Sequence, residues 1–188
     1  QMGILSKIPQ EKLTKLLKIP VLSWVLKRKF KKALGLGKAR SIVSGAAPLQ
    51  ETQRTWFRKI GVPITNGYGM TENCAITTHL GDGIINKPGS VGLAQPGVTL
   101  KIDSESSEIL MRGPYVMKEY YKQPELTAEV IKEGWLHTGD QGHIDAEGFL
   151  FITGRVKDIF KTSKGKYIEP LVLEGFFGDV LEFEQICI

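Results

Sequence analysis

A strand–helix–strand pattern between residues 41 and 65 constrains the fold of this chain more than any other feature of its sequence. Residues 41–44 form a short strand-like run, and a helix is expected to open at Pro48 and end at Gly61. One face of that helix carries Gln53, Trp56, Phe57 and Ile60. Residues 62–65 form a second short run. Two strands joined by a helix within so few residues predict a parallel α/β unit.

After about residue 88 the sequence changes to short strand-like runs separated by turn residues. Short runs such as "VTLKID", "EILMRG" and "GFLFITGR" are separated by Gly, Pro, Asp and Ser, which predicts a small antiparallel sheet or partial barrel. One helix interrupts these strands, "PELTAEVIKEG", with Pro124 at its start, Val130 and Ile131 inward and Gly134 at its end. A further helix is expected near Pro170. The predicted fold class is therefore α/β, a parallel portion followed by an antiparallel one.

The net charge of +5 hides a basic N-terminal segment. Residues 1–40 hold eleven Lys or Arg and one acidic residue, a balance of +10, and the remainder holds fourteen basic and nineteen acidic residues, a balance of −5. Within residues 1–40, leucines and valines recur at helical spacing, and Pro20 is expected to separate two helices or bend one. Two interpretations stay open: a pair of surface helices, or an interfacial helix attracted to anionic lipid or an acyl carrier.

The composition limits the cellular compartments and the classes of partner that we expect for this protein. The two cysteines, Cys74 and Cys187, form no disulfide or metal-ligand pattern, which is typical of a reducing compartment. No secretory signal is recognised, and the longest apolar run is too short to span a bilayer. We therefore expect a cytoplasmic protein that does not bind nucleic acid, with peripheral membrane contact through residues 1–40 left open.

Two loops follow the predicted parallel strands. The first is Gly45, Ala46 and Ala47, and the second is "NGYGMTE", residues 66–72. Ligands of open parallel sheets bind outside the carboxyl ends of the strands, so both loops are expected to face one crevice. Tyr68 offers a face on which a flat base can stack, Thr71 a hydroxyl for a phosphate and Glu72 an oxygen for Mg²⁺. The alternative is a plain turn in which Thr71 caps a helix and Glu72 is its first-turn acid.

A third loop is predicted at "HTGD", residues 137–140. Asp140 there would accept hydrogen bonds from both hydroxyls of a ribose, and Arg155 could hold the same ribose or a phosphate. The alternatives are a turn residue for Asp140 and a surface ion pair with Asp158 for Arg155. The three histidines have no metal-ligand spacing, and neither a P-loop nor a G-x-S-x-G elbow is present.

The order of the motifs resembles one known family. "SGAAPL", "NGYGMTE", "GSVGLAQPG", "GWLHTGD" and "GRVKDIFKTSKGKYIEP" follow one another as in the adenylate-forming (acyl-CoA synthetase, or AMP-binding) superfamily. Within it the chain is most similar to the long-chain fatty acyl-CoA synthetases, from about Ala39 to Pro170. The resemblance implies the adenylate-forming fold and the ATP-dependent conversion of a fatty acid, through an acyl-adenylate, to its coenzyme A thioester. ATP or AMP, Mg²⁺ and coenzyme A are the implied ligands.

The resemblance also implies roles for individual residues. Thr71 and Glu72 would be catalytic, with Thr71 at the α-phosphate and Glu72 holding Mg²⁺. Lys157 would be the hinge before a mobile C-terminal domain, and Gly165 would lie on the loop that meets the thiol. The implied nucleotide-binding residues are Gly45, Ala46, Ala47, Asn66, Gly67, Tyr68, Gly69, Met70, Thr71, Asp140 and Arg155.

The sequence also departs from the family pattern. The upstream phosphate loop with its lysine, most of the acyl tunnel and the distal adenylating lysine are absent, so the chain is interpreted as an internal fragment that is inactive alone. Residues 1–155 would be the later part of the large nucleotide-binding domain, and 156–188 the start of the small one. Two alternatives remain, a ligase that loads an acyl carrier protein and a non-catalytic nucleotide-binding module. A homodimer also stays open.

Overall fold

The computed structural model describes residues 10–45, 49, 51–78, 87–158, 160–161 and 167–168. For residues 10–12, 14, 160–161 and 167–168 only the backbone is described. The chain divides into two compact units. The helical unit comprises Gln1–Ile42 with Thr52–Ile64, and the sheet unit comprises Val43–Glu51 with Thr65–Ile188.

The helical unit is built mainly from α1 (Gln10–Leu17), α2 (Pro20–Ala33) and most of α3 (Glu51–Lys59). Pro20 occupies the first turn of α2, where its missing N–H costs nothing. Pro20 therefore separates two helices, which was one of the two outcomes expected for it; the other was a bend in a single helix. The helix expected to open at Pro48 begins at Glu51 in the described residues, and Gly61 follows its end with φ +81°.

An apolar cluster holds the helical unit together. Its buried members are Leu13, Phe30, Ile60 and Val62, and around them pack Leu17, Leu26, Leu36, Ile42, Trp56, Phe57 and Ile64. The rings of Trp56 and Phe57 meet edge to face at 5.1 Å. The prediction of a strand over 62–65 is wrong for its first part, because Val62 is fully buried in this cluster and strand pairing begins only at Thr65.

Two short parallel strands open the sheet unit. β1 (Val43–Ser44) pairs with β2 (Thr65–Asn66) in the register Val43–Thr65 and Ser44–Asn66. The pairing confirms the parallel α/β portion predicted from the sequence. Each strand is shorter than the sequence pattern suggested, because the flanking apolar residues Ile42 and Ile64 pack against the helical cluster instead.

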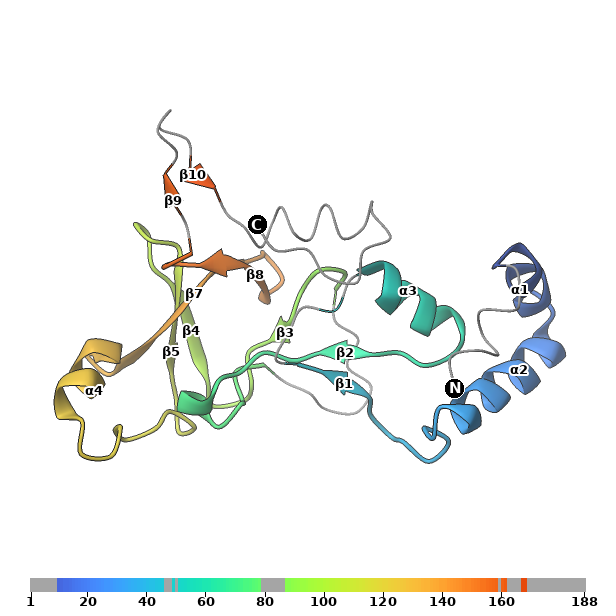
Figure 1. Ribbon diagram of the computed structural model, residues 1–188, viewed down its shortest axis with the longest axis horizontal. Helices are drawn as coiled ribbons and strands as arrows, with labels where there is room; N and C mark the ends of the chain where they lie inside the picture. The colour runs from blue at the N-terminus through green and yellow to red at the C-terminus, as the bar shows by residue number, and fades with distance from the viewer. Residues whose placement is uncertain are drawn as a thin grey trace. The chain divides into compact units, whose positions relative to one another are not determined.

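A larger antiparallel sheet of six strands follows in the described part of the sheet unit. Its order is β3-β8-β7-β5-β4, and β6 pairs separately with β7. Figure 1 shows β4, β5 and β7 running together on one side of the unit, and β7 pairing onward with β8. The strands are β3 (Gly92–Leu93), β4 (Thr99–Ile102), β5 (Glu108–Arg112), β6 (Ile131–Lys132), β7 (Trp135–Ile144) and β8 (Phe149–Arg155). This sheet confirms the predicted antiparallel portion.

One helix and several short elements complete the description. α4 (Pro124–Val130) packs beside β6 and β7, and it starts at Pro124 as predicted. Its end was predicted wrongly. The chain turns from helix directly into β6 at Ile131, and Gly134 lies with φ +78° in the tight turn to β7. The remaining short elements are the 3₁₀ helix η2 (Thr71–Asn73), β9 (Phe160–Lys161) and β10 (Tyr167–Ile168), the last two paired antiparallel. The helix expected near Pro170 lies outside the described residues.

The core of the sheet unit lies where β5, β7 and β8 meet. Tyr68, Ile109 and Leu150 are buried there, and Val91, Leu100, Ile102 and Ile152 pack around them. At Gly142 in β7, an added Cβ would lie 2.2 Å from the carbonyl oxygen of Phe151 in β8. The sheet therefore requires a glycine at this approach.

Candidate functional site

The first two predicted loops meet at the ends of β1 and β2. The N–H of Gly67 donates to the carbonyl of Ser44 at 2.8 Å. A Cβ built on Gly45 would come within 3.6 Å of the carbonyl oxygen of Gly67. The structure therefore brings Gly45 together with Asn66 and Gly67, as expected for neighbouring parallel strands. Ala46 and Ala47 lie outside the described residues.

The segment after β2 folds back on itself in a tight loop. A Cβ on Gly69 would lie 2.2 Å from the carbonyl carbon of Ala75, so only glycine fits at this position. Cys74 and Ala75 adopt left-handed backbone, with φ 56° and 57°. The N–H groups of Thr77 and Thr78 both donate to the carbonyl of Tyr68, which closes the loop. The loop thus holds strained, specific backbone geometry next to the predicted phosphate-binding residues.

Thr71 and Glu72 lie on η2 at the tip of this loop. The N-cap position of η2 belongs to Met70, whose N–H donates to Asn73 Oδ1 at 2.9 Å. The alternative in which Thr71 is the helix cap is therefore wrong. Thr71 is exposed, and Glu72 is a partly buried first-turn acid. Asn73 is fully buried, and its amide donates to Thr77 Oγ1 at 2.7 Å, which anchors η2 to the rest of the loop.

Asp140 lies inside a strand and not in a loop. The stretch 137–140 was predicted as a loop from its glycine and aspartate, but it is part of β7, which pairs with β5 on one side and β8 on the other. Both ladders are irregular near this point, and Gly139 adopts φ +74° within the strand. Asp140 is buried in this irregular part of the sheet, with 8% of the residue exposed.

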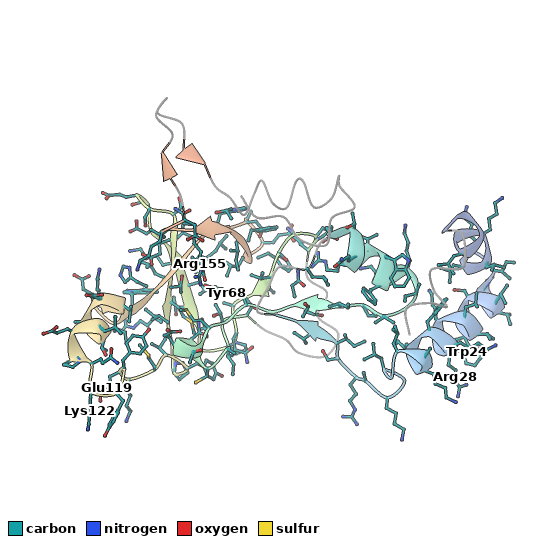
Figure 2. All side chains as sticks on the ribbon, viewed as in Figure 1. Trp24, Arg28, Tyr68, Glu119, Lys122 and Arg155 are labelled. Carbon is teal, nitrogen blue, oxygen red and sulfur yellow. The ribbon has the colours of Figure 1, made fainter. Side chains whose placement is uncertain are left out.

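Asp140 joins two other predicted residues through its carboxylate. Tyr68 donates its hydroxyl to Oδ2 at 2.6 Å, and Arg155 donates Nε to Oδ1 at 3.0 Å. Asp140 and Arg155 are direct register partners across β7 and β8. Figure 2 labels Tyr68 and Arg155, the two residues that this carboxylate connects. The structure thus brings Tyr68, Asp140 and Arg155 together, and their roles at a nucleotide stay predictions.

The electrostatics of this cluster keep Tyr68 neutral and Asp140 paired. Burial raises the pKa of Tyr68 well above its usual range, and the hydrogen bond to Asp140 acts in the same direction. Arg155 keeps 64% of its side chain exposed and supplies the compensating positive charge. Because a carboxylate has about four acceptor sites, two remain on Asp140 for further donors such as a pair of hydroxyls. Only 9% of Tyr68 is exposed, so base stacking on its ring stays a prediction.

Glu108 braces the strand that carries Asp140, and sequence reasoning missed it. Its Oε1 accepts the N–H of Gly139 at 2.8 Å, and its Oε2 lies 2.8 Å from His137 Nδ1. A carboxylate that accepts a backbone N–H one residue before Asp140 limits the freedom of the glycine there. No local pattern marks Glu108, because it reaches β7 only through the pairing of β5 with β7.

Tyr120 contacts the predicted metal ligand, and it too was missed. Its hydroxyl donates to Glu72 Oε1 at 2.6 Å. This hydrogen bond is the main reason why the pKa of Tyr120 is raised to about 12, with burial and the charge of Glu72 adding to it. The one sequence signal is the adjacent pair Tyr120 and Tyr121, which carries no meaning before the fold is known.

The carboxylate of Glu72 is a suitable ligand for a magnesium ion that binds together with a nucleotide. Among the described residues, no three His, Cys, Asp or Glu side chains gather into a metal site. Mg²⁺ is commonly bound by one or two carboxylates together with phosphate oxygens and water. Glu72 is the one acidic residue in the loop of residues 66–78. A single carboxylate of this kind suits an ion that also binds phosphate oxygens.

The remaining predicted positions lie beyond β8. Lys157 is exposed in the turn that follows Arg155, and Gly165 lies outside the described residues. The alternative of an Arg155–Asp158 ion pair is not what forms: Arg155 pairs with Asp140, and Asp158 donates its backbone N–H to the carbonyl of Arg155. The hinge role of Lys157 stays a prediction.

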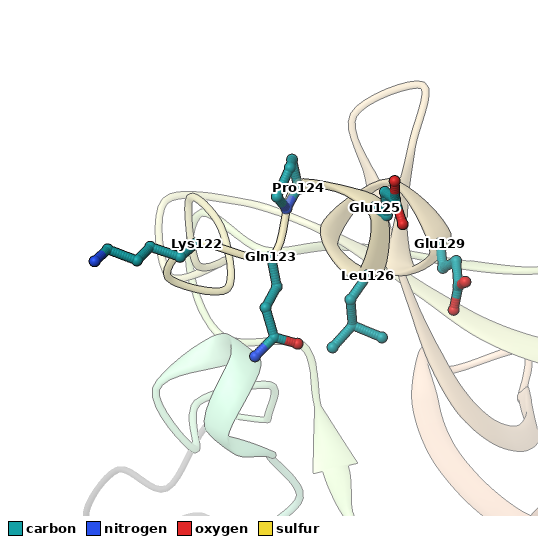
Figure 3. Close-up of a pocket in the computed structure, with 6 residues that line it drawn as sticks. All are labelled: Lys122, Gln123, Pro124, Glu125, Leu126 and Glu129. Atoms are coloured by element: carbon teal, nitrogen blue, oxygen red, sulfur yellow. The ribbon is translucent and has the colours of Figure 1, made fainter.

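An open hollow lies at the start of α4 (Figure 3). Gln123 and Leu126 point to the same side of the backbone there. Its lining consists of Lys122, Gln123, Pro124, Glu125, Leu126 and Glu129. None of the predicted nucleotide-binding residues lines it. Its exposed, mixed-charge lining marks no ligand class.

The helix α2, in the basic N-terminal segment, exposes apolar side chains. On and before α2, Ile19, Val21 and Trp24 are 53%, 76% and 62% exposed. The guanidinium of Arg28 lies over the Trp24 ring at 5.5 Å, and both are labelled in Figure 2. Of the helices that the structure describes, none has the length and apolar character needed to span a membrane. Peripheral membrane contact through residues 1–40 stays a prediction.

Comparison with known proteins finds relatives that carry out one class of reaction. The chain is 40% identical over 149 residues to the long-chain-fatty-acid–CoA ligase FadD15 of Mycobacterium bovis, covering 78% of this chain and 24% of that protein. It is 34% identical to long chain acyl-CoA synthetase 3 of Arabidopsis thaliana, covering 90% and 27%. It is also 32% identical to the indoleacetate–CoA ligase of Aromatoleum aromaticum, covering 96% and 38%. The chain thus spans about a quarter to two fifths of the length of these relatives.

Solved structures with the same fold include enzymes bound to adenylates and nucleotides. The anthranilate CoA ligase AuaEII in complex with anthranoyl-AMP matches 74% of this chain and 29% of its own, with a TM-score of 0.62 and 30% identity. O-succinylbenzoate coenzyme A synthetase of Bacillus subtilis, in complex with ATP and a magnesium ion, matches 84% and 34%, with a TM-score of 0.64 and 26% identity. The observed parallel and antiparallel portions therefore correspond to the adenylate-forming fold.

A family model for the AMP-binding enzymes matches residues 5–121. That match covers β1, β2, the tight loop with Thr71 and Glu72, and Tyr120, while the relatives extend the similarity through Asp140. On this family match, the ordered motifs and the shared fold, the chain belongs to the AMP-binding, adenylate-forming enzymes.

Proposed function

We propose that this chain supplies the adenosine-binding part of an ATP-dependent ligase that activates a long-chain fatty acid. The observation that carries the proposal is the cluster in which Tyr68 and Arg155 both donate to Asp140, at 2.6 and 3.0 Å. A carboxylate fixed in this way by two donors is preorganised to accept the two hydroxyls of a ribose. Named relatives that act on long-chain fatty acids favour that substrate.

The reaction would proceed in two steps. A carboxylate oxygen of the fatty acid attacks the α-phosphorus of ATP, and pyrophosphate leaves, which forms the acyl-adenylate. The thiol of coenzyme A then attacks the acyl carbon, and AMP leaves. Asp140 and Arg155 would hold the ribose, and Thr71 would donate to the α-phosphate. Mg²⁺, held by Glu72 and the phosphates, would neutralise the charge that develops on them.

The domain boundary is part of the same proposal. Residues 1–155 would belong to the large nucleotide-binding domain, and the chain from residue 156 onward to a smaller domain that changes orientation between the two steps. Lys157 would be the hinge, because it is exposed immediately after the strand that carries Arg155.

Binding of an acyl-adenylate analogue tests the adenosine site. We expect the purified chain to bind a non-hydrolysable palmitoyl-adenylate analogue saturably in a calorimetric titration, and Asp140→Ala to abolish that binding. The matched control is Asp145→Ala, which removes a carboxylate immediately after the end of β7. Equal binding by the wild type and Asp140→Ala would contradict the assignment of the ribose site.

The acyl substrate needs a separate experiment. In the full protein that contains this chain, pyrophosphate release would be compared with palmitate, indoleacetate and benzoate as acids. We expect palmitate to give the highest kcat/KM. A preference for an aromatic acid, as the name of the Aromatoleum relative suggests for that protein, would contradict the long-chain proposal and leave the adenosine site intact. Replacing coenzyme A by an acyl carrier protein in the same assay tests the alternative acceptor.

A further inference from the structure

The segment between β5 and α4 is tied to the loop that carries Glu72. The backbone N–H of Met117 donates to the carbonyl of Glu72 at 2.7 Å. The hydroxyl of Tyr120 donates to Glu72 Oε1 at 2.6 Å. The first hydrogen bond fixes the backbone of Glu72 and the second fixes its carboxylate. A residue 48 positions away along the chain thus sets the orientation of this side chain.

Tyr120 is itself held in place by the start of α4. Its N–H donates to Thr127 Oγ1 at 2.9 Å, and its carbonyl accepts the N–H of Gln123 at 3.0 Å. Thr127 Oγ1 donates in turn to the carbonyl of Gln123 at 2.8 Å. Because α4 packs beside β6 and β7, these hydrogen bonds fix the position of Tyr120 relative to the sheet.

The contact engages only one of the two carboxylate oxygens. Within the described part of the chain, Glu72 Oε2 accepts no hydrogen bond. A glutamate side chain left free would lose rotamer freedom on binding a cation, and a tyrosine that holds it beforehand removes part of that cost. Groups that hydrogen-bond to a metal ligand and orient it typically change metal affinity or activity about 10- to 100-fold when they are removed.

We propose that Tyr120 is a positioning residue for Glu72, holding one carboxylate oxygen so that the other is available to the divalent cation that accompanies the nucleotide. The inference rests on the proposed function, in which Glu72 is the metal ligand. Tyr120 itself contacts neither the nucleotide nor the cation in this proposal. The adjacent Tyr121 is 80% exposed, and Tyr121→Phe provides a control that removes a tyrosine hydroxyl next in sequence to Tyr120.

The test compares Tyr120→Phe with Tyr121→Phe in the full protein that contains this chain. The readouts are the Mg²⁺ dependence of ATP–pyrophosphate exchange and the binding of Mn²⁺ in the presence of a non-hydrolysable ATP analogue, followed by electron paramagnetic resonance. For Tyr120→Phe we expect the half-saturating concentrations of both metals to rise about tenfold, with the exchange rate at saturating Mg²⁺ much less affected. Tyr121→Phe should match the wild type in both.

Two outcomes would overturn the proposal. One is an unchanged metal midpoint in Tyr120→Phe, and the other is a fall in exchange rate by the same factor at every Mg²⁺ concentration, which indicates a merely structural role. A wild type without metal-dependent exchange or Mn²⁺ binding would instead refute the proposed function. Thr127→Val, which removes the acceptor of the Tyr120 N–H, gives a second and milder perturbation. It should shift the metal midpoints in the same direction, and an unchanged midpoint in both variants excludes the role.

Discussion

The helical unit and the sheet unit are stabilised by different kinds of contact. The helical unit packs around an apolar cluster centred on Phe30 and Ile60. Both units bury polar side chains, among them Arg54 in the helical unit. In the sheet unit a buried hydroxyl and carboxylate, those of Tyr68 and Asp140, hydrogen-bond across segments that are far apart in the sequence. Apolar packing tolerates changes of shape, whereas a buried polar group that loses its partner is costly. The candidate site lies in the unit where geometry is more strictly constrained.

Replacing a glycine in each unit should give the largest contrast. Gly69→Ala places a Cβ 2.2 Å from the Ala75 backbone, so we expect a loss of more than about 3 kcal/mol of stability. Gly35→Ala in the helical unit meets no atom within 4 Å and carries only the strain of φ +75°, about 1 kcal/mol. Urea unfolding of the two variants measures the difference, and similar losses would contradict the close approach at Gly69.

Removing one buried isoleucine from each unit tests whether the two cores act separately. Ile60 and Ile109 are both fully buried, in the helical and the sheet cluster respectively. Ile60→Ala and Ile109→Ala should each cost about 2–5 kcal/mol by the cavity that they leave. We expect hydrogen exchange to speed up only in the unit that carries the substitution. Loss of protection in both units by either variant would show that the two cores unfold as one.

Tyr68→Phe removes the buried hydrogen bond to Asp140. Because the acceptor is charged, the loss should be about 2 kcal/mol near neutral pH. The pKa of Tyr68 is raised in the folded state, so the stability gained from its neutral hydroxyl is complete below the ordinary tyrosine pKa of about 10 and is lost as pH rises further. Denaturant midpoints between about pH 8 and pH 11 should therefore fall more steeply for the wild type than for Tyr68→Phe. Parallel profiles would show that Tyr68 titrates normally.

The surface pair of Lys87 and Asp145 should have the smallest effect. The hydrogen bond from Lys87 lowers the pKa of Asp145, so its contribution is present above the ordinary aspartate pKa and is lost as pH falls through the lowered value. The stability difference between the wild type and Asp145→Asn should shrink as pH is lowered from about 4 to about 2. Glu147→Gln, on the more exposed partner of Lys87, should cost less stability still near neutral pH.

Local patterns predicted the elements better than their ends. The proline at position 20 separates two helices and the proline at 124 starts one, because proline fixes the backbone angle of a first turn. Gly134 was predicted to end a helix because glycine is a common helix stop signal, yet it lies in the turn between β6 and β7. A glycine with positive φ serves either purpose, and only strand pairing distinguishes them. The stretch 137–140 looked like a loop for the same reason.

Sequence by itself determined the class of fold, the order of its parallel and antiparallel portions, and the residue types at the candidate site, since these depend on periodicity and on local backbone preference. Tertiary structure alone decided the neighbours of those residues. The hydrogen bond between Tyr68 and Asp140 joins positions 72 residues apart, and that between Tyr120 and Glu72 joins positions 48 apart. Contacts of this kind depend on the register of β5, β7 and β8 and on the packing of α4, which no local stretch of sequence encodes.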